Sequence, residues 1–262
     1  MLEWKFKEHR LLRKMGVNHN LMMDLLSKNY RKKYFKIYNE KPIEIARSLG
    51  CLFSEKTPGW ALREIFVEEI YNVNGFVPAK GDVVADIGAF YGDSSIYWSK
   101  VKQASVVAFE ALTSNFLVLK ENIDLNNASI KAYNVALGDG NNIRASEDGK
   151  MLSTDTGGDY IQTKRLDDFS FDRLDLIKID VEGFEESVLK GSLNTLAKFQ
   201  PKIIIETHSK NLGIKCNDLI VKQGYVLERV IKASVKPAKG SWMDQVENRF
   251  YLPASAVRNN IH

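Results

Sequence analysis

Four segments of the sequence combine acidic, glycine or histidine side chains in a way that suits a small-molecule site. The first runs from Asp86 to Gly92, where a carboxylate precedes a turn that contains glycine. Glycine directly after a strand lets a ligand approach the backbone closely. The turn lacks the G-x-G-x-x-G spacing of a dinucleotide cradle, because Phe90 and Asp93 occupy the second and third glycine positions. An NAD site is therefore disfavoured.

The other three segments place acids or an imidazole after runs of apolar residues. Glu110 ends one such run, at the place where a carboxylate can accept both hydroxyls of a ribose. Asp180 and Glu182 follow the run Leu176-Ile177-Lys178-Ile179, and His208 follows the run Ile203-Ile204-Ile205-Glu206-Thr207. Histidine titrates near neutral pH, and carboxylates at a strand end can also accept protons. Asp180, Glu182 and His208 are therefore the candidate catalytic residues, with His208 and Asp180 ranked ahead of Glu182.

A parallel sheet is needed to bring these segments together. From Gly81 onward, short runs rich in valine and isoleucine alternate with helical stretches, which is typical of strands joined by crossover helices. The expected strands are 83–87, 105–110, 130–136, 174–180, 202–206, 225–230 and 248–252. Residues 138–158 are polar and rich in turn residues, so we expect an excursion rather than a core element. Ligands bind beyond the carboxyl ends of such strands, where every candidate residue lies.

Composition limits the class of protein. The 262 residues, 44% of them hydrophobic, suit one large domain or one domain with an added cap. No apolar run approaches the roughly 18 residues of a membrane span, and the charged first residues lack the apolar core of a signal peptide, so we expect a cytoplasmic protein. The two cysteines, Cys51 and Cys216, are too few for a disulfide framework or a zinc site of their own.

Four blocks in this order resemble the FkbM family of methyltransferases: Asp86-Ile87-Gly88-Ala89, Ala108-Phe109-Glu110, Ile177-Lys178-Ile179-Asp180-Val181-Glu182-Gly183 and Glu206-Thr207-His208. Smaller matches lie at Lys120-Glu121-Asn122 with Asn126-Asn127, at Ala136-Leu137-Gly138-Asp139 and at Arg165-Leu166-Asp167-Asp168. The resemblance covers about residues 65–230. The sequence departs from the family at Phe90, where Asn is common, and at Ala111, where Pro usually follows the acid.

The resemblance implies an α/β, Rossmann-like class I methyltransferase fold: a seven-stranded, mostly parallel sheet with an N-terminal helical cap. It also implies S-adenosylmethionine as the cofactor. This molecule carries a sulfonium cation and an amino acid, so it needs no phosphate cradle and suits a carboxylate such as Asp86. The residues expected to contact it are Asp86, Gly88, Ala89, Phe90, Tyr91, Gly92, Ser95, Glu110, Ala111, Asn134, Val135, Ala136 and Asp180.

The family further implies O-methylation of a hydroxyl on a small molecule, sugar or lipid. No metal is predicted, although Asp180, Glu182, Glu206 and His208 carry donor atoms that metals bind. The sequence does not specify the acceptor or the oligomeric state. The loop after the fourth strand lacks an Asn-Pro-Pro-Tyr-like motif of amino methylation, and Asp180-Val181-Glu182-Gly183 stands there instead. We expect no nucleic-acid partner.

The N-terminal part of the chain differs from the rest. Residues 1–50 carry twelve lysines and arginines against five acids, read as helices and contain one proline, Pro42. We expect residues 1–80 to form a helical cap over the carboxyl edge of the sheet, with Trp60 and Tyr71 beside the acceptor, and residues 81–262 to form the methyltransferase domain. The basic cluster Arg31-Lys32-Lys33 leaves one alternative open, a non-catalytic protein that binds nucleic acid or a membrane surface. An NAD-dependent oxidoreductase is the other.

Overall fold

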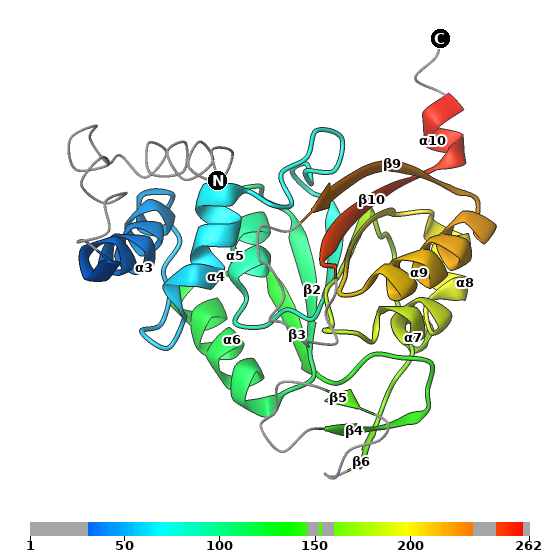
Figure 1. Ribbon diagram of the computed structural model, residues 1–262, viewed down its shortest axis with the longest axis horizontal. Helices are drawn as coiled ribbons and strands as arrows, with labels where there is room; N and C mark the ends of the chain where they lie inside the picture. Colours follow the sequence, from blue (N-terminus) through cyan, green and yellow to red (C-terminus); the bar gives the residue numbers. More distant parts are fainter. Residues whose placement is uncertain (1–30, 146–151, 154–159, 233–244, 259–262) are drawn as a thin grey trace.

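The central feature of the computed structural model is a seven-stranded sheet in the order β3-β2-β1-β7-β8-β10-β9 (Figure 1). The structure describes residues 31–145, 152–153, 160–232 and 245–258. The strands of this sheet are β1 (Val83–Ile87), β2 (Ser105–Glu110), β3 (Ile130–Asn134), β7 (Leu176–Ile179), β8 (Lys202–Thr207), β9 (Tyr225–Lys232) and β10 (Glu247–Pro253). The neighbouring strands β3, β2, β1, β7 and β8 pair in parallel, and β10 runs antiparallel to both β8 and β9.

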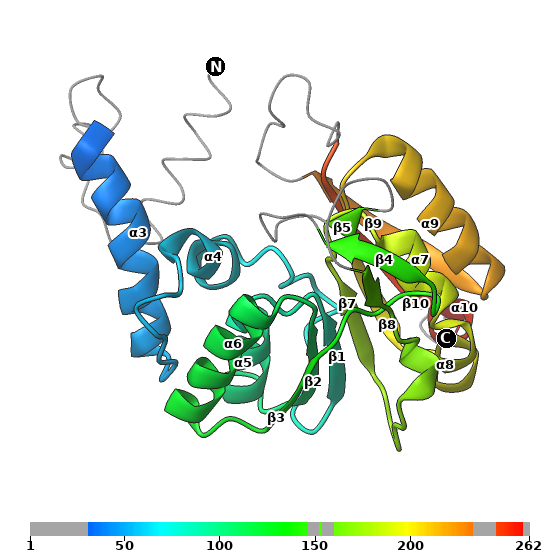
Figure 2. The ribbon, with the colours of Figure 1, turned by 90° about the horizontal axis from the view of Figure 1, so that it is seen from below.

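Helices cover both faces of the sheet. The described helices are α3 (Arg31–Ser48), α4 (Gly59–Arg63), the π-helix η2 (Glu64–Glu68), α5 (Asp93–Lys100), α6 (Thr113–Asn126), the 3-10 helix η3 (Leu166–Asp168), α7 (Glu185–Lys190), α8 (Leu193–Phe199), α9 (Lys210–Lys222) and α10 (Ala254–Arg258). Figure 2 shows α5 and α6 on one side of the sheet and α7, α8 and α9 on the other. Among the described residues, none of the helices has the length and apolar character to cross a bilayer.

Successive side chains of each strand point to opposite faces of the central sheet, and both faces are apolar. In β8, Ile204 packs into the cluster beneath α5 and α6, whereas Ile203 and Ile205 pack into the cluster beneath α7 to α9. All three isoleucines are fully buried. This explains why the strands with helices on both faces read as nearly continuous apolar runs.

The chain order places a site between β1 and β7. The strands β1, β2 and β3 extend toward one edge, and the chain then returns to place β7 on the other side of β1. The crevice at such a reversal, beyond the carboxyl ends of the strands, is where open α/β sheets bind ligands. The expected seven-stranded, mostly parallel sheet is confirmed.

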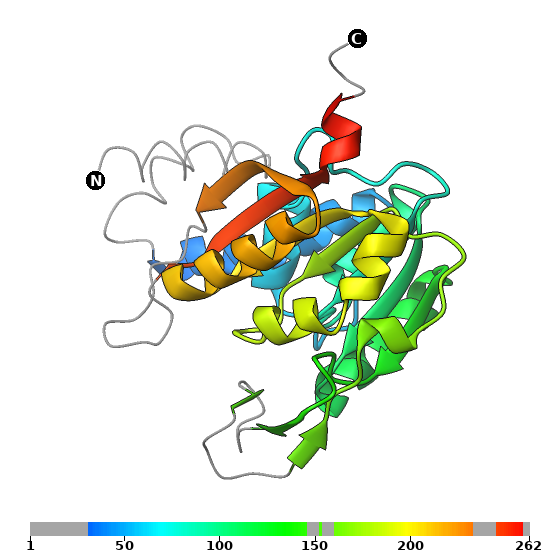
Figure 3. The same ribbon diagram turned by 90° about the vertical axis from the view of Figure 1, so that its right-hand side faces the viewer.

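Two expected strand boundaries need correction, and a small second sheet was not predicted. The strand expected at 130–136 ends at Asn134, and that expected at 174–180 covers only Leu176–Ile179. The expected polar excursion contains β4 (Asn142–Ala145) and β5 (Leu152–Ser153), which pair with β6 (Tyr160–Gln162) in a separate antiparallel sheet. Strands of two to four residues are too short to show the alternation that sequence patterns depend on. This small sheet lies at one end of the molecule, away from the central sheet (Figure 3).

The described part of the N-terminal region packs on the α5–α6 side. Helix α3 contacts α4 and η2, and η2 contacts α5. Two asparagines of α6 hold the connecting segment: Asn126 Nδ2 donates to Leu52 O at 2.6 Å, and Ser54 N donates to Asn122 Oδ1 at 2.7 Å. Residues 1–30 lie outside the described part of the chain, and so does most of the basic segment.

Candidate active site

The turn after β1 brings the backbone of two strands into close contact. Gly88 has a φ of +75°, and a Cβ atom there would lie 1.8 Å from the Asp180 carbonyl oxygen. The amides of Gly88 and Ala89 both donate to Phe109 O at 3.0 Å. Only glycine satisfies the left-handed conformation and the close approach together. The turn is therefore fixed against β2 and β7.

Phe90 holds a backbone conformation that is unusual for its residue type. Its φ is +49°, a region in which Asn is far more common than Phe. Its amide donates to Glu110 Oε2 at 2.9 Å. Its ring stacks on Tyr91 with centroids 4.0 Å apart and lies 5.5 Å from the half-exposed ring of Trp60. The turn is therefore bordered by three aromatic rings.

Glu110 ends β2 directly beside this turn. Its carboxylate accepts from the amides of Phe90 and Leu112, both at 2.9 Å. Burial raises the pKa of Glu110 to about 7, although these hydrogen bonds act in the opposite direction. Two groups at the end of β3 bind the Glu110 carbonyl, since Asn134 Nδ2 and the amide of Val135, directly after the strand, both donate to it at 3.0 Å. The carboxylate is thus held in place at the strand end.

Asp86 has internal partners for its charge. It is fully buried, accepts hydrogen bonds from Ser94 Oγ at 2.7 Å and Ser95 Oγ at 2.6 Å, and lies 3.2 Å from Lys178 Nζ. Ser95 is fully buried as well. Lys178 thus already pairs with the Asp86 charge that the sequence suggested for a positive ligand. A contact of Asp86 or Ser95 with the cofactor stays a prediction.

His208 lies at the centre of four carboxylates. It follows β8 and is 2% exposed. Its Nδ1 lies 2.8 Å from Glu185 Oε1, on the first turn of α7. Its Nε2 lies 3.4 Å from Glu182 Oε2, 3.6 Å from Glu206 Oε1 and 3.8 Å from Asp180 Oδ1. The three predicted catalytic residues are thus brought together.

The carboxylates set the charge of this imidazole. Burial alone lowers the pKa of His208, but the hydrogen bond from its Nδ1 to Glu185 and the charges of Asp180, Glu185 and Glu182 raise it to about 10. His208 without a ligand nearby is therefore an imidazolium at neutral pH.

The edge of the sheet holds more negative charge than its cations balance. Burial, followed by repulsion from Glu206, Asp93 and Asp180, raises the pKa of Glu64 to about 8. Burial raises the pKa of Asp93 to about 7, and burial with the charge of Asp180 raises that of Glu206. Raised pKa values of several carboxyl groups at one place indicate that a positively charged ligand would be favoured there. The sulfonium of S-adenosylmethionine fits this requirement.

Tyr71 joins the N-terminal region to the same edge. Its hydroxyl donates to Asp180 Oδ2 at 3.2 Å, and its ring centroid lies 6.0 Å from that of Trp98. Sequence reasoning placed Tyr71 near the acceptor but did not identify Lys178, Glu185 or Glu64 as part of the site. One signal for Lys178 was its position two residues before Asp180, which puts both on the same face of a strand. Acids in a first helical turn, such as Glu185, are common without function.

Asp180, Glu182 and His208 also offer three ligand atoms within 4.8 Å of one another. Carboxylate oxygen and imidazole nitrogen are donors that several divalent metals accept. The expected absence of a metal stays a prediction.

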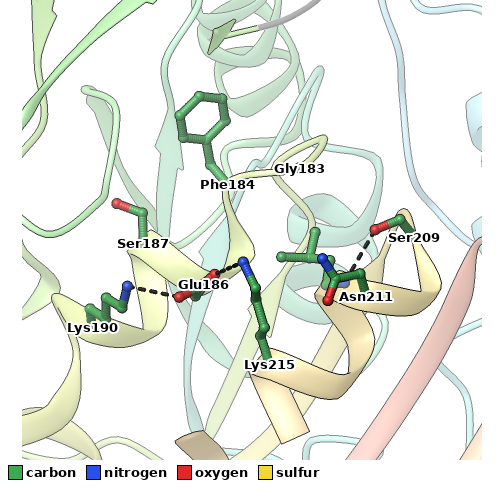
Figure 4. Close-up of a pocket in the computed structure, with 9 residues that line it drawn as sticks. Gly183, Phe184, Glu186, Ser187, Lys190, Ser209, Asn211 and Lys215 are labelled. Carbon is green, nitrogen blue, oxygen red and sulfur yellow. Dashed lines mark hydrogen bonds and ion pairs between the residues drawn. The ribbon is translucent and has the colours of Figure 1, made fainter. Parts of the chain in front are cut away.

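A separate cavity of about 360 Å³ lies between α7 and α9 (Figure 4). It is lined by Gly183, Phe184, Glu186, Ser187, Lys190, Ser209, Asn211, Leu212 and Lys215. Glu186 pairs with Lys190 at 2.7 Å and with Lys215 at 3.3 Å, so one carboxylate is shared by two lysines. None of the residues predicted to bind the cofactor or to act in catalysis lines this cavity.

The strand order, the turn after β1 and the acids beyond β2 and β7 define a Rossmann-like methyltransferase domain. Residues 86–227 match the Methyltransferase FkbM domain, which is more than half of the chain. The chain belongs to this family, and the cofactor of such a domain is S-adenosylmethionine. The NAD-dependent oxidoreductase and the non-catalytic binding protein are not favoured.

Two curated proteins and a solved structure are similar to the chain. Methyltransferase 1 of Beauveria bassiana is 29% identical over 163 residues, which are 49% of this chain and 65% of that protein. The antimetabolite synthetase AmbE of Pseudomonas aeruginosa is 24% identical over 222 residues, covering 63% of this chain and 10% of AmbE. The chain thus spans less than two thirds of both relatives. The methyltransferase FkbM structure from Methylobacillus flagellatus has a TM-score of 0.48 and 18% identity, covering 80% of this chain and 59% of that one.

Proposed function

We propose that the protein transfers the methyl group of S-adenosylmethionine to a hydroxyl of a small molecule, sugar or lipid. The cofactor supplies an electrophilic methyl group, and a hydroxyl acceptor must lose its proton. The observation that supports this reaction is the His208 imidazole, held through Nδ1 by Glu185 and directed through Nε2 at Asp180, Glu182 and Glu206. This is an arrangement suited to moving a proton.

In this proposal, the turn from Gly88 to Gly92 holds the cofactor with Glu110, whose carboxylate would accept the ribose hydroxyls. The fixed position of Glu110 beside the Phe90 amide supports this role. Asp180 lies across the turn, because its backbone amide donates to Ile87 O at 3.0 Å. Its carboxylate would face the positive charge of the cofactor. The same site would include Ala89, Tyr91, Ala111 and Asn134 to Ala136, which the sequence predicts as cofactor contacts.

His208 would be the proton acceptor, with Asp180 and Glu182 orienting the acceptor hydroxyl. An imidazolium cannot accept a proton, so His208 must first lose one. A cation bound among these carboxylates would lower the pKa of His208, because like charges disfavour the protonated form. Glu185 would then hold Nδ1 and leave Nε2 to the hydroxyl. General-base assistance of this kind contributes about 10²–10⁴-fold to the rate.

The N-terminal residues 1–80 would form a cap that keeps water from the reacting groups, while residues 81–262 form the catalytic domain. The bond from Tyr71 to Asp180 and the closeness of Trp60 to Phe90 support a cap that reaches the carboxyl edge. Exclusion of water strengthens electrostatic interactions inside a site. The cytoplasmic location expected from the sequence stays a prediction.

The test is a transfer assay with cofactor labelled in its methyl group, offered to extracts of hydroxylated small molecules. We expect a methyl ether product. We expect His208→Ala to reduce turnover about 10²–10⁴-fold while S-adenosylhomocysteine binds within about twofold of wild type. Lys190→Ala, which removes one of the two lysine partners of Glu186 on the outer side of α7, is the control. Label found only in RNA or protein, or nearly normal turnover of His208→Ala, would overturn the proposal.

A further inference from the structure

Lys178 is a buried cation in the middle of the central sheet. It lies on β7, between β1 and β8, and its side chain is 4% exposed. The neighbouring strand residues Leu176, Ile177 and Ile179 are apolar and buried. Removing an ammonium group from water is costly unless it is well paired. The partners of Lys178 therefore indicate what it does.

Those partners belong to the elements that meet at the cofactor turn. Lys178 Nζ donates to the Gly88 carbonyl at 2.7 Å, lies 3.2 Å from Asp86 Oδ1 and lies 3.7 Å from Asp180 Oδ2. The sheet register creates this arrangement, because Asp86 on β1 pairs with Lys178 on β7. The ammonium also lies 5.8 Å from the centroid of the Tyr71 ring.

The network continues into the helix after the turn. The second carboxylate oxygen of Asp86 accepts both Ser94 Oγ and Ser95 Oγ, at the start of α5. One buried ion pair thus connects the ends of β1 and β7, the turn between β1 and α5, and the first turn of α5.

We propose that Lys178 is a positioning residue for cofactor binding. It neutralises Asp86, holds the Gly88 carbonyl and so fixes the shape of the turn, and it sets the direction of the Asp180 carboxylate. Asp86 then acts through Lys178 and the two serines rather than by direct contact with the cofactor. The inference rests on the proposed function only in placing the cofactor at this turn.

Lys178→Met tests this inference, because it keeps much of the side-chain length and removes the charge. Without its counterion, the buried carboxylate of Asp86 is destabilised and Gly88 loses a hydrogen bond. We expect the Kd of S-adenosylhomocysteine, measured by calorimetry, to rise about 10- to 100-fold. In methyl transfer, we expect the KM for the cofactor to rise more than kcat falls, since the turn binds ground and transition states alike. Lys190→Met, at a lysine paired on the outer surface, is the matched control.

The double variant Asp86→Asn, Lys178→Met separates a positioning pair from a direct contact. If the two charges serve mainly each other, removing both restores part of the affinity and raises the melting temperature above that of Lys178→Met. This variant also keeps the test valid if Lys178→Met fails to fold. A folded Lys178→Met with unchanged Kd would overturn the proposal, and so would a double variant that binds no better than the single one. Calorimetry needs no acceptor, so its result is independent of whether a hydroxyl is the methylated group.

Discussion

The hydrogen bond between Glu185 and His208 leads to a quantitative prediction for Glu185→Gln. Two unit charges 2.8 Å apart interact by about 6 kcal/mol at an effective dielectric constant of about 20, which corresponds to about 4 pH units. Glutamine keeps an oxygen that can accept from Nδ1, and nearby groups relax. Neighbouring charges in proteins typically shift a pKa by about 1–3 units. We therefore expect Glu185→Gln to lower the pKa of His208 from about 10 by about 1–3 units.

The measurement is an NMR titration of the His208 ring from pH 6 to pH 11 in protein labelled with ¹⁵N-histidine, with His208→Asn to assign the signal. Glu186→Gln is the matched control, because it removes the next carboxylate of α7, which pairs with Lys190 and Lys215 instead. The control should leave the pKa of His208 nearly unchanged. Urea denaturation provides a second measurement, because the pKa of His208 also affects how the free energy of unfolding depends on pH.

The sign of the stability effect follows from the raised pKa. The stabilisation by protonated His208 is complete below the unfolded pKa of about 6.5 and is lost as the pH rises through about 10. At pH 7 to 8, Glu185→Gln should therefore lower the free energy of unfolding, by about 1.4 kcal/mol for each unit by which the His208 pKa falls. A wild-type His208 that titrates near pH 6.5, or a pKa unchanged in Glu185→Gln, would refute the reasoning.

Three further variants test the turn. Glu110→Ala should weaken S-adenosylhomocysteine binding by about 1.5–3 kcal/mol in calorimetry, and an unchanged affinity would remove the ribose assignment. Gly88→Ala should lower the free energy of unfolding by at least about 2 kcal/mol in urea, since its Cβ would lie 1.8 Å from the Asp180 carbonyl oxygen. Phe90→Gly should be more stable than Phe90→Ala by about 1 kcal/mol, because both lose the ring and only glycine relieves the φ of +49°. Equal stability of the last two would contradict a strained Phe90.

The sequence was sufficient for the central sheet because its strands are long enough to show their pattern. The runs at β1, β2 and β8 are rich in valine and isoleucine and are followed by helices, which leaves few topologies. It was insufficient for β4 to β6, whose pairing depends on contacts between short polar segments. The shortened ends of β3 and β7 have a similar cause, because strand ends depend on neighbouring backbone rather than on side-chain type.

The candidate site was predictable to the extent that it depends on strand ends. Asp180 and His208 follow adjacent parallel strands, and the structure brings them within 3.8 Å. Glu185 was not predictable, because an acid in a first helical turn reads as an ordinary helix-dipole partner. Its role depends on burial, which it acquires when α7 packs against β8 and α9.

Phe90 shows how structure explains a departure from the family pattern. The φ of this position is +49°, which Asn adopts more readily than Phe. The family preference for Asn here is thus consistent with a backbone requirement. In this chain the left-handed conformation is kept with a bulky ring, which stacks on Tyr91 and lies near Trp60. Aromatic contacts of this kind contribute about 0.5–1.5 kcal/mol each, comparable to the cost of the conformation.

Asp86 and Lys178 change how the charge of the site should be counted. The sequence predicts that the Asp86 carboxylate meets a cationic ligand, but Lys178 and two serines contact its oxygens. The carboxyl groups left to meet a cationic cofactor would then be Asp180, Glu206 and Glu64, which lie on β7, β8 and η2 or directly after them. Glu64 precedes the residues that match the family, and burial with the charges of Glu206, Asp93 and Asp180 raises its pKa, so the N-terminal region would contribute a carboxyl group to the site. We therefore expect replacement of Glu64 to change the Kd of the cofactor, although Glu64 lies outside the residues that match the family.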